Sequence, residues 1–154
     1  MKTITTGLTL ALCFFGAGLS FADDPQMGTW KLNETKSKFA PGAAKNHTVV
    51  YEAAGDNVKI TVDGTDKEGK STHNEWTGKF DGKDYPVIGD PSANTRSLRL
   101  VKPGHYALTN KKDGKTVLTG TVDFSADNKS RTLTTDMTDA AGKKQKSIAV
   151  YDRQ

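Results

Sequence analysis

The stretch VKITVDGTDKEGKSTHNEWTGKFDGK, residues 58–83, contains the pattern from which the fold can be predicted. Apolar residues alternate with polar ones at 58–62 and again at 76–80, and the sequence Glu68-Gly69-Lys70 lies between these runs. Successive side chains of a β-strand point to opposite faces, so each run predicts a strand with one apolar face. Glycine in a short polar connection supplies the positive φ of a tight turn, so the stretch predicts an antiparallel hairpin.

The same rhythm continues along the rest of the chain. Alternating runs recur at 96–100 and 118–124, and no segment shows the 3.6-residue apolar period of a helix. Turn signals separate the runs at regular intervals. The further signals are Gly55-Asp56-Asn57, Asp81-Gly82-Lys83, Pro91-Ser92-Ala93-Asn94, Pro103-Gly104, Asp113-Gly114-Lys115, Asp127-Asn128-Lys129 and Ala141-Gly142-Lys143.

These connections predict an all-β domain, an antiparallel up-and-down meander of about ten strands. An open sheet of that size has two exposed edges, and closure into a barrel or a flattened clam removes them. A β-sandwich is the alternative, and it usually needs longer crossover connections. Only residues 33–46 could form one.

The N-terminus has the pattern of an export signal. Lys2 precedes an apolar run at 7–19, and Ser20-Phe21-Ala22 places small residues where a signal peptidase cleaves. The expected division is a signal peptide at 1–22 and a single barrel domain at 23–154, exported to the periplasm or the cell exterior. An uncleaved anchor, or a lipid on Cys13, is the alternative.

Cleavage would remove Cys13, the only cysteine, so the mature domain would have no disulfide. The net charge of +4 would fall to about +3 with the loss of Lys2, and the basic residues are scattered. This distribution does not favour nucleic-acid binding, which needs a concentrated basic face. No stable membrane insertion is expected after cleavage.

Two short motifs at the ends of the domain resemble those of a known family. The segments GTWKL, at 28–32, and VYDR, at 150–153, look like the two ends of the fatty-acid-binding proteins, and the wider calycin superfamily, lipocalins included, also opens with Gly-x-Trp. The chain also looks like small exported bacterial lipocalin-like proteins of unassigned function. The resemblance implies that the first and last strands close the barrel, with Trp30 plugging its base. Gly28 would allow the backbone to bend or approach closely there, and Arg153 could stack on Trp30.

The chain departs from that family in two places. The segment at 33–46 contains Pro41 and Gly42 and is too short for the two-helix lid, although one short helical turn with Phe39 against the barrel end would fit. The family binds a carboxylate with an arginine two residues before the tyrosine that corresponds to Tyr151, and here that position is Ala149. The sequence does not settle whether Tyr151 or its neighbours point inward.

Several residues are candidates for ligand contacts. Arg96 and Arg131 share strand faces with leucines, where a cation needs a partner or water. Each could meet an anionic head group, or could extend its charged end to solvent from a strand end. Aromatic side chains could line a pocket or simply fill the core. They are Trp76, Phe80, Tyr85 and Tyr106, and the Tyr151 hydroxyl is a further candidate.

Motifs for catalysis and metal binding are weak. His73 and Glu75 lie two residues apart and are expected on the solvent face, so a zinc site with His47 or His105 is not favoured. The sequence has no nucleophile elbow, phosphate loop or His-Glu-x-x-His motif. We expect neither enzymatic activity nor a cofactor.

Two functions remain after these exclusions. The first is an exported, non-enzymatic binding protein for a small hydrophobic or amphipathic ligand, such as a fatty-acid-like molecule. The second is an envelope-associated or protein-interaction barrel, inhibitors included, with a packed interior and no ligand. The small number of large apolar residues per strand predicts an incompletely filled interior, which favours the first.

Overall fold

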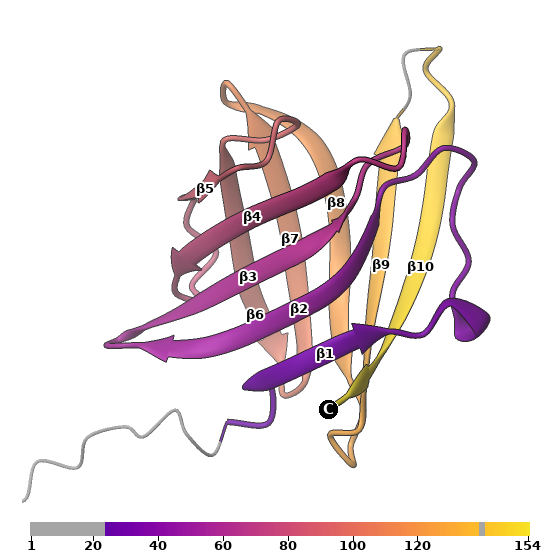
Figure 1. Cartoon of the computed structure of the whole chain (residues 1–154). Helices are drawn as coiled ribbons and strands as arrows, with labels where there is room; N and C mark the ends of the chain where they lie inside the picture. The colour runs from indigo at the N-terminus through magenta and orange to yellow at the C-terminus, as the bar shows by residue number, and fades with distance from the viewer. Residues whose placement is uncertain (1–23, 139–140) are drawn as a thin grey trace, which may run out of the picture.

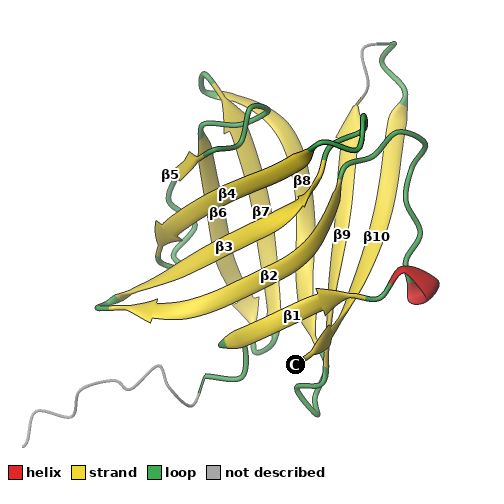
Figure 2. Ribbon diagram, viewed as in Figure 1, coloured by secondary structure: helices red, strands yellow, loops and turns green. Residues whose placement is uncertain are grey.

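The computed structural model describes residues 24–138 and 141–154. The signal peptide predicted at 1–22 and its cleavage point lie outside the described residues. The described chain forms ten strands and one 3-10 turn, η2 (Figures 1 and 2). The strands are β1 (Gly28–Leu32), β2 (Lys45–Ala54), β3 (Asn57–Thr65), β4 (Ser71–Gly78), β5 (Tyr85–Ile88), β6 (Thr95–Lys102), β7 (His105–Lys112), β8 (Lys115–Phe124), β9 (Ser130–Thr138) and β10 (Lys144–Arg153).

The strands form a closed antiparallel barrel in which every strand pairs with its neighbours in the sequence. Closure occurs between β1 and β10, where Trp30 lies opposite Arg153 and Leu32 opposite Tyr151. The two described ends of the chain therefore meet at one end of the barrel (Figure 1). The predicted all-β meander, its strand number and its closure are confirmed.

The connection between β1 and β2 contains one short turn of helix and no lid. The η2 turn spans Glu34–Lys36, and the Asn33 side chain caps it by accepting a hydrogen bond from the Lys36 amide at 3.2 Å. Phe39 is half-buried and packs on the core beyond the turn. The single turn and the place of Phe39 agree with the sequence-based expectation.

The alternation of side chains sorts the chain into a lumen and an outer surface. The inward set includes Trp30, Tyr51, Trp76 and Tyr151, each at most 4 % exposed. Each such ring contributes about 1.5–3 kcal/mol through burial. On β10 the inward residues are Ala149 and Tyr151, which settles the orientation that the sequence left open.

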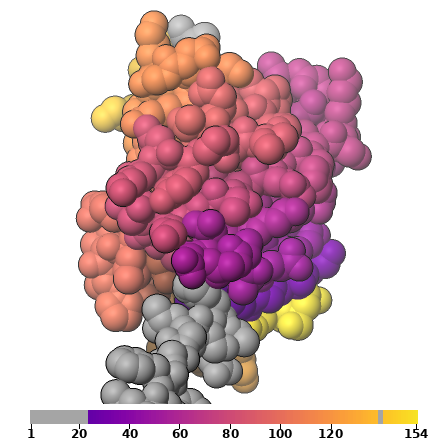
Figure 3. All heavy atoms as spheres, turned by 90° about the vertical axis from the view of Figure 1, so that its left-hand side faces the viewer, coloured from indigo at the N-terminus to yellow at the C-terminus, as the bar shows by residue number. Residues whose placement is uncertain are grey.

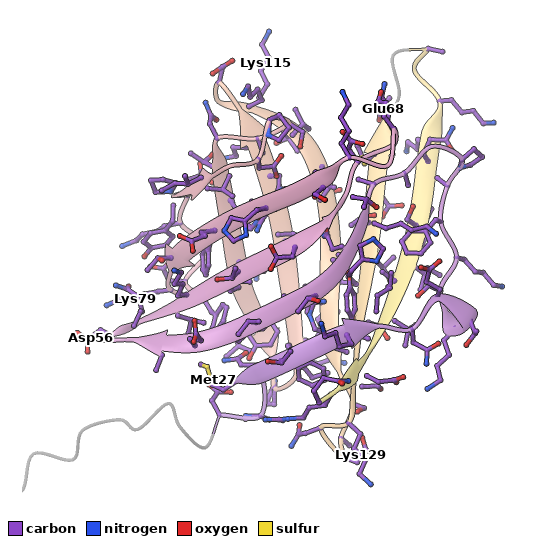
Figure 4. The ribbon with its side chains drawn as sticks, in the orientation of Figure 1. Met27, Asp56, Glu68, Lys79, Lys115 and Lys129 are labelled. Carbon is purple, nitrogen blue, oxygen red and sulfur yellow. The ribbon has the colours of Figure 1, made fainter. Side chains whose placement is uncertain are left out.

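The barrel has two distinct ends. Figure 4 shows Met27 and Lys129 near one of them, and Glu68 and Lys115 at the other. We call the Met27 end, where β1 begins and β10 finishes, the base. The opposite end contains the β3–β4 and β7–β8 turns.

The barrel has its fewest strand-to-strand residue pairs at β5. This four-residue strand forms two residue pairs with β4 and two with β6, and Ile88 is 70 % exposed. Side chains nevertheless give a closed surface on this side in the space-filling view (Figure 3). Within residues 24–138 and 141–154, no helix is long and apolar enough to cross a membrane.

Candidate functional site

The base of the barrel is closed by residues 24–27, which we call the strap. Asp24 and Pro25 begin a β-turn in which the Met27 amide donates to the Asp24 carbonyl at 3.0 Å. The turn leads the chain across the base into Gly28, whose φ of 111° is strained for any residue with a side chain. Gln26 is 2 % exposed and points into the lumen, where it lines an interior space with aromatic residues.

Three hydrogen bonds hold the strap through its backbone carbonyls. Arg153 donates to the Pro25 carbonyl at 2.9 Å and to the Met27 carbonyl at 2.6 Å. The Trp30 indole donates to the Gln26 carbonyl at 3.0 Å. The Arg153 guanidinium also lies 5.4 Å from the centre of a Trp30 ring, so the stacking predicted for this pair is present.

Arg131, on β9, lies inside the barrel and is 5 % exposed. Its guanidinium is 4.7 Å from the Tyr151 ring centre and 5.6 Å from that of Tyr51, and its Nε donates to the Tyr51 hydroxyl at 3.2 Å. Its Nη1 is buried and has no hydrogen-bond partner among residues 24–138 and 141–154. The alternative in which this arginine reaches solvent is therefore wrong, because the strand alternation directs it into the lumen.

Arg96, on β6, is partly buried and is much better paired. Its guanidinium donates to Asn110 Oδ1 at 2.9 Å and to Asn74 Oδ1 at 3.4 Å, and lies 3.5 Å from Asp90 Oδ2. The exposed fractions of the Arg96 and Asp90 side chains are 11 % and 13 %. Solvent exposure of the charged end is thus wrong for Arg96 too, since three inward acceptors hold it.

The two arginines belong to one electrostatic environment. Burial lowers the pKa of the Arg96 guanidinium, the Asp90 carboxylate opposes this shift, and the positive charge of Arg131 adds to it. Among the described residues, Arg96 forms an ion pair with Asp90, and Arg131 forms no ion pair. The two arginines have one described ion-pair partner between them, Asp90, so positive charge predominates around them, while the Asp24 carboxylate lies at the base, where it binds Gln26 and adds to the effect of burial in raising the pKa of Tyr106.

The aromatic candidates pack into one cluster. Trp76 stacks on Phe80 with ring centres 6.2 Å apart and meets Tyr85 edge-on at 5.8 Å. Tyr106 lies 4.9 Å from Phe80 and 5.9 Å from Phe124. Burial raises the pKa of Tyr106 to about 12, because the phenolate would lose its hydration. The structure thus brings together Trp76, Phe80, Tyr85 and Tyr106.

This cluster leaves little free space in the barrel. A region lined by Gln26, Tyr51, Phe80, Leu98, Tyr106, Val122 and Phe124 has about 150 Å³ of space between atoms, but no part of it is wide enough for a water molecule. The expectation of an incompletely filled interior is therefore not met in this region. The reason is that the rings of Tyr51, Phe80, Tyr106 and Phe124 pack closely, edge to face or tilted, and the Gln26 side chain fills the space from the base.

The histidine group considered as a metal site lies on the outer surface. His73 Nδ1 is 2.7 Å from Asp63 Oδ1, and His73 Nε2 is 3.8 Å from Glu75 Oε1. The hydrogen bond with Asp63 raises the pKa of His73. In the part of the chain that the structure describes, no group of three potential ligands converges on a metal position.

Sequence reasoning missed five residues that bring polar groups into the interior. Asn74 and Asn110 could have been found, because each continues the inward face of a strand, next to Trp76 or Leu108. Tyr51 likewise follows Val49 on β2. Asp90 and Gln26 lie in connections, where no periodic pattern indicates the direction of a side chain.

Comparisons with known proteins support the fold and do not assign a family. A solved structure described as EF1p2_mFAP2b bound to DFHBI matches 84 % of this chain and 94 % of that chain, with a TM-score of 0.50 and 11 % sequence identity. A similarity at this identity concerns the fold alone. No protein-family model matches the chain, and no curated protein does. The ten-stranded barrel is compatible with a calycin-like fold.

Proposed function

We propose that this protein is an exported, non-enzymatic binding protein for a small amphipathic ligand with an anionic head group. The observation that supports it is Arg131: a guanidinium that is 5 % exposed, with one N–H group lacking any partner. A buried unpartnered donor costs free energy and is rare in folded proteins. An anion held at Nη1 would remove that cost.

The surroundings of Arg131 suit an anion better than a neutral group. Its two ring partners, Tyr51 and Tyr151, interact with the cation but do not neutralise it. Asp90, the acid in the ion pair with Arg96, is already engaged. A ligand carboxylate would accept charge-assisted hydrogen bonds from Arg131 and lie in the field of Arg96.

Binding requires side chains to move, because the space beside Tyr51 does not admit a water molecule. The remainder of the ligand would displace apolar contacts among Phe80, Tyr106 and Phe124. The solved barrel with bound DFHBI has a similar fold, and it gives a precedent for a ligand on such a scaffold, although a shared fold alone does not determine function.

The test compares an acid with its neutral counterpart. The full-length protein is expressed so that export and processing can occur, and is titrated with 11-(dansylamino)undecanoic acid and with its methyl ester. Arg131→Gln should weaken binding of the acid by at least tenfold, which corresponds to the loss of one charge-assisted contact. The ester should lose much less.

Arg99→Gln is the matched control, since this arginine lies on the outer face of β6 and is exposed. The control should bind both probes as the unmodified protein does. Equal losses for acid and ester in Arg131→Gln would contradict an anion contact. If the unmodified protein binds neither this long-chain acid nor a short aromatic acid such as phenylacetate, and no small molecule co-purifies by mass spectrometry, the function itself is refuted.

The close packing of the interior beside Gln26 favours a second candidate. This is a packed barrel that acts through its outer surface, in the envelope or on another protein. In that case Arg131 would be a structural residue, and its removal would change stability without any ligand effect. The same titration distinguishes the two candidates. Export is tested separately by the mass of the purified chain, which should begin at Asp23.

A further inference from the structure

We infer that the side chain of Gln26 occupies part of the ligand site in the free protein, and that a small aromatic carboxylic acid replaces it when it binds. The inference rests on the proposed function and narrows it. It assigns the ring of the ligand to the space that Gln26 now fills, and its carboxylate to Arg131. It also makes the strap the moving part.

The environment of Gln26 satisfies its amide only in part, through Asp24 and the Tyr106 hydroxyl. The side chain lines a space formed by four aromatic rings and two aliphatic side chains, and its Oε1 is buried without a partner. Its Nε2 donates to Asp24 Oδ2 at 2.7 Å, within the strap itself. An aromatic ring in the same place could pack against Phe80, Tyr106 and Phe124; Tyr106 already meets Phe80 at a tilt and Phe124 edge to face.

The position of the site relative to Arg131 selects an acid. Tyr51 lines the space beside Gln26, and its hydroxyl accepts a hydrogen bond from Arg131 Nε. Phe124 lines the same space and lies directly opposite Arg131 in the β8–β9 ladder. Tyr51 therefore connects the space that holds Gln26 to Arg131, and among the described residues Gln26 Oε1 and Arg131 Nη1 are the buried side-chain atoms without partners.

The size of the region selects a short ligand. Space for the ligand arises mainly from the departure of one glutamine side chain, because the rest of the region does not admit water. A single ring with a short acid side chain fits this limit, whereas a long alkyl chain would have to displace several core residues.

The strap can move as a unit. Its closed turn is held to the barrel by carbonyl contacts from Arg153 and Trp30, and none of these contacts depends on the side chain of Gln26. Gly28 follows it directly with a positive φ, where glycine can change conformation at least cost. Breaking three hydrogen bonds at the base would withdraw Gln26 from the lumen.

Binding of phenylacetate by calorimetry tests the inference with three variants of the full-length protein. Gln26→Ala should bind about tenfold more tightly than the unmodified protein, because no side chain has to be displaced. Gln26→Leu keeps a side chain of similar size and should bind no more tightly than the unmodified protein. Gln154→Ala makes the same change at an exposed glutamine near the base and should change nothing.

Two indole N–H signals provide an independent reading by nuclear magnetic resonance on the unmodified protein. Trp30 donates to the strap and Trp76 to the Arg96 carbonyl at 2.9 Å. On saturation with phenylacetate the Trp30 indole signal should shift and exchange faster with solvent, while that of Trp76 stays protected. This reading decides the matter even where Gln26→Ala does not fold.

The outcomes separate the inference from the function on which it rests. If phenylacetate or the dansyl acid binds, but Gln26→Ala gains no affinity and the Trp30 signal does not change, the displacement of the strap is wrong and the binding function stands. If phenylacetamide binds as well as phenylacetate, the assignment of an acid is wrong. If neither acid binds to the unmodified protein or to Gln26→Ala, both proposals are refuted.

Discussion

Replacement of Arg153 by alanine should destabilise the barrel by about 2 kcal/mol. The arginine donates two hydrogen bonds to strap carbonyls, at 2.9 and 2.6 Å, and stacks on Trp30 at 5.4 Å. A hydrogen bond from a charged donor contributes about 1.5 kcal/mol at the low end of its range, and an exposed cation–π contact about 0.5 kcal/mol. Since Arg153 is exposed at the barrel surface, solvent weakens these contacts, and about 2 kcal/mol remains.

Urea unfolding followed by far-ultraviolet circular dichroism measures this loss without depending on the tryptophan signal. With a slope near 2 kcal/mol per molar urea, the midpoint should fall by about 1 M. Arg153→Lys should lose about half as much, because an ammonium lacks the planar fork that reaches both carbonyls. Arg99→Ala, at an exposed arginine, should stay within about 0.5 kcal/mol. Coincident midpoints for the Arg153 and Arg99 variants would refute the role given to the seam contacts.

Three further results are expected. Arg131→Met should change the unfolding free energy by less than about 1 kcal/mol, because loss of ring contacts is offset by removal of a buried charge; a loss above about 3 kcal/mol in urea unfolding would make the residue a structural centre. The pKa of Tyr106 is raised from 10.0 to about 12, so the folded state keeps a proton that the unfolded state releases. Stability should therefore fall between pH 10 and 12 by on the order of 2 kcal/mol, and Tyr106→Phe should lack this part of the fall in urea midpoints. Asp63→Asn should lower the pKa of His73 in a nuclear magnetic resonance titration, because it removes the hydrogen bond that raises it.

Much of the fold could be predicted because the alternation of apolar and polar residues along a strand indicates which side chains face the core and which face solvent. The run at 58–62 alternates in the sequence, and in the barrel its Val58, Ile60 and Val62 are all buried. The Gly-containing turns then leave antiparallel pairing as the simplest arrangement, and closure follows from the need to cover two edges. Local patterns were sufficient because every pairing except β1 with β10 joins consecutive strands.

The sequence predicted an incompletely filled interior, and this prediction failed in the region beside Gln26 for a physical reason. An estimate based on large apolar residues omits the volume of long polar side chains, and here Gln26, Arg96 and Arg131 all occupy the interior. The direction of the Gln26 side chain depends on how the strap is held across the base. Arg153, more than a hundred residues further along the chain, donates to the carbonyls of Pro25 and Met27 on either side of it. No local pattern near residue 26 contains that information.

The two arginines that the sequence treats alike differ in their surroundings. Arg96 has three acceptors, and one of them, Asp90, carries the opposite charge. Removal of Arg96 would therefore leave Asn74, Asn110 and Asp90 without this hydrogen-bond donor, as happens when one partner of an internal ion pair is lost.

Arg131 is held by the hydroxyls and rings of Tyr51 and Tyr151 and has an N–H group without a partner. Its removal would leave the hydroxyls of Tyr51 and Tyr151 without this donor but would leave no charged group unpaired, so we expect the fold to need it less than Arg96. If Arg131→Met proves as stable as expected, the buried unpaired Nη1 is not required by the fold, and an anionic ligand would account for it. These contacts favour a structural role for Arg96 and, under the proposed function, a ligand-binding role for Arg131.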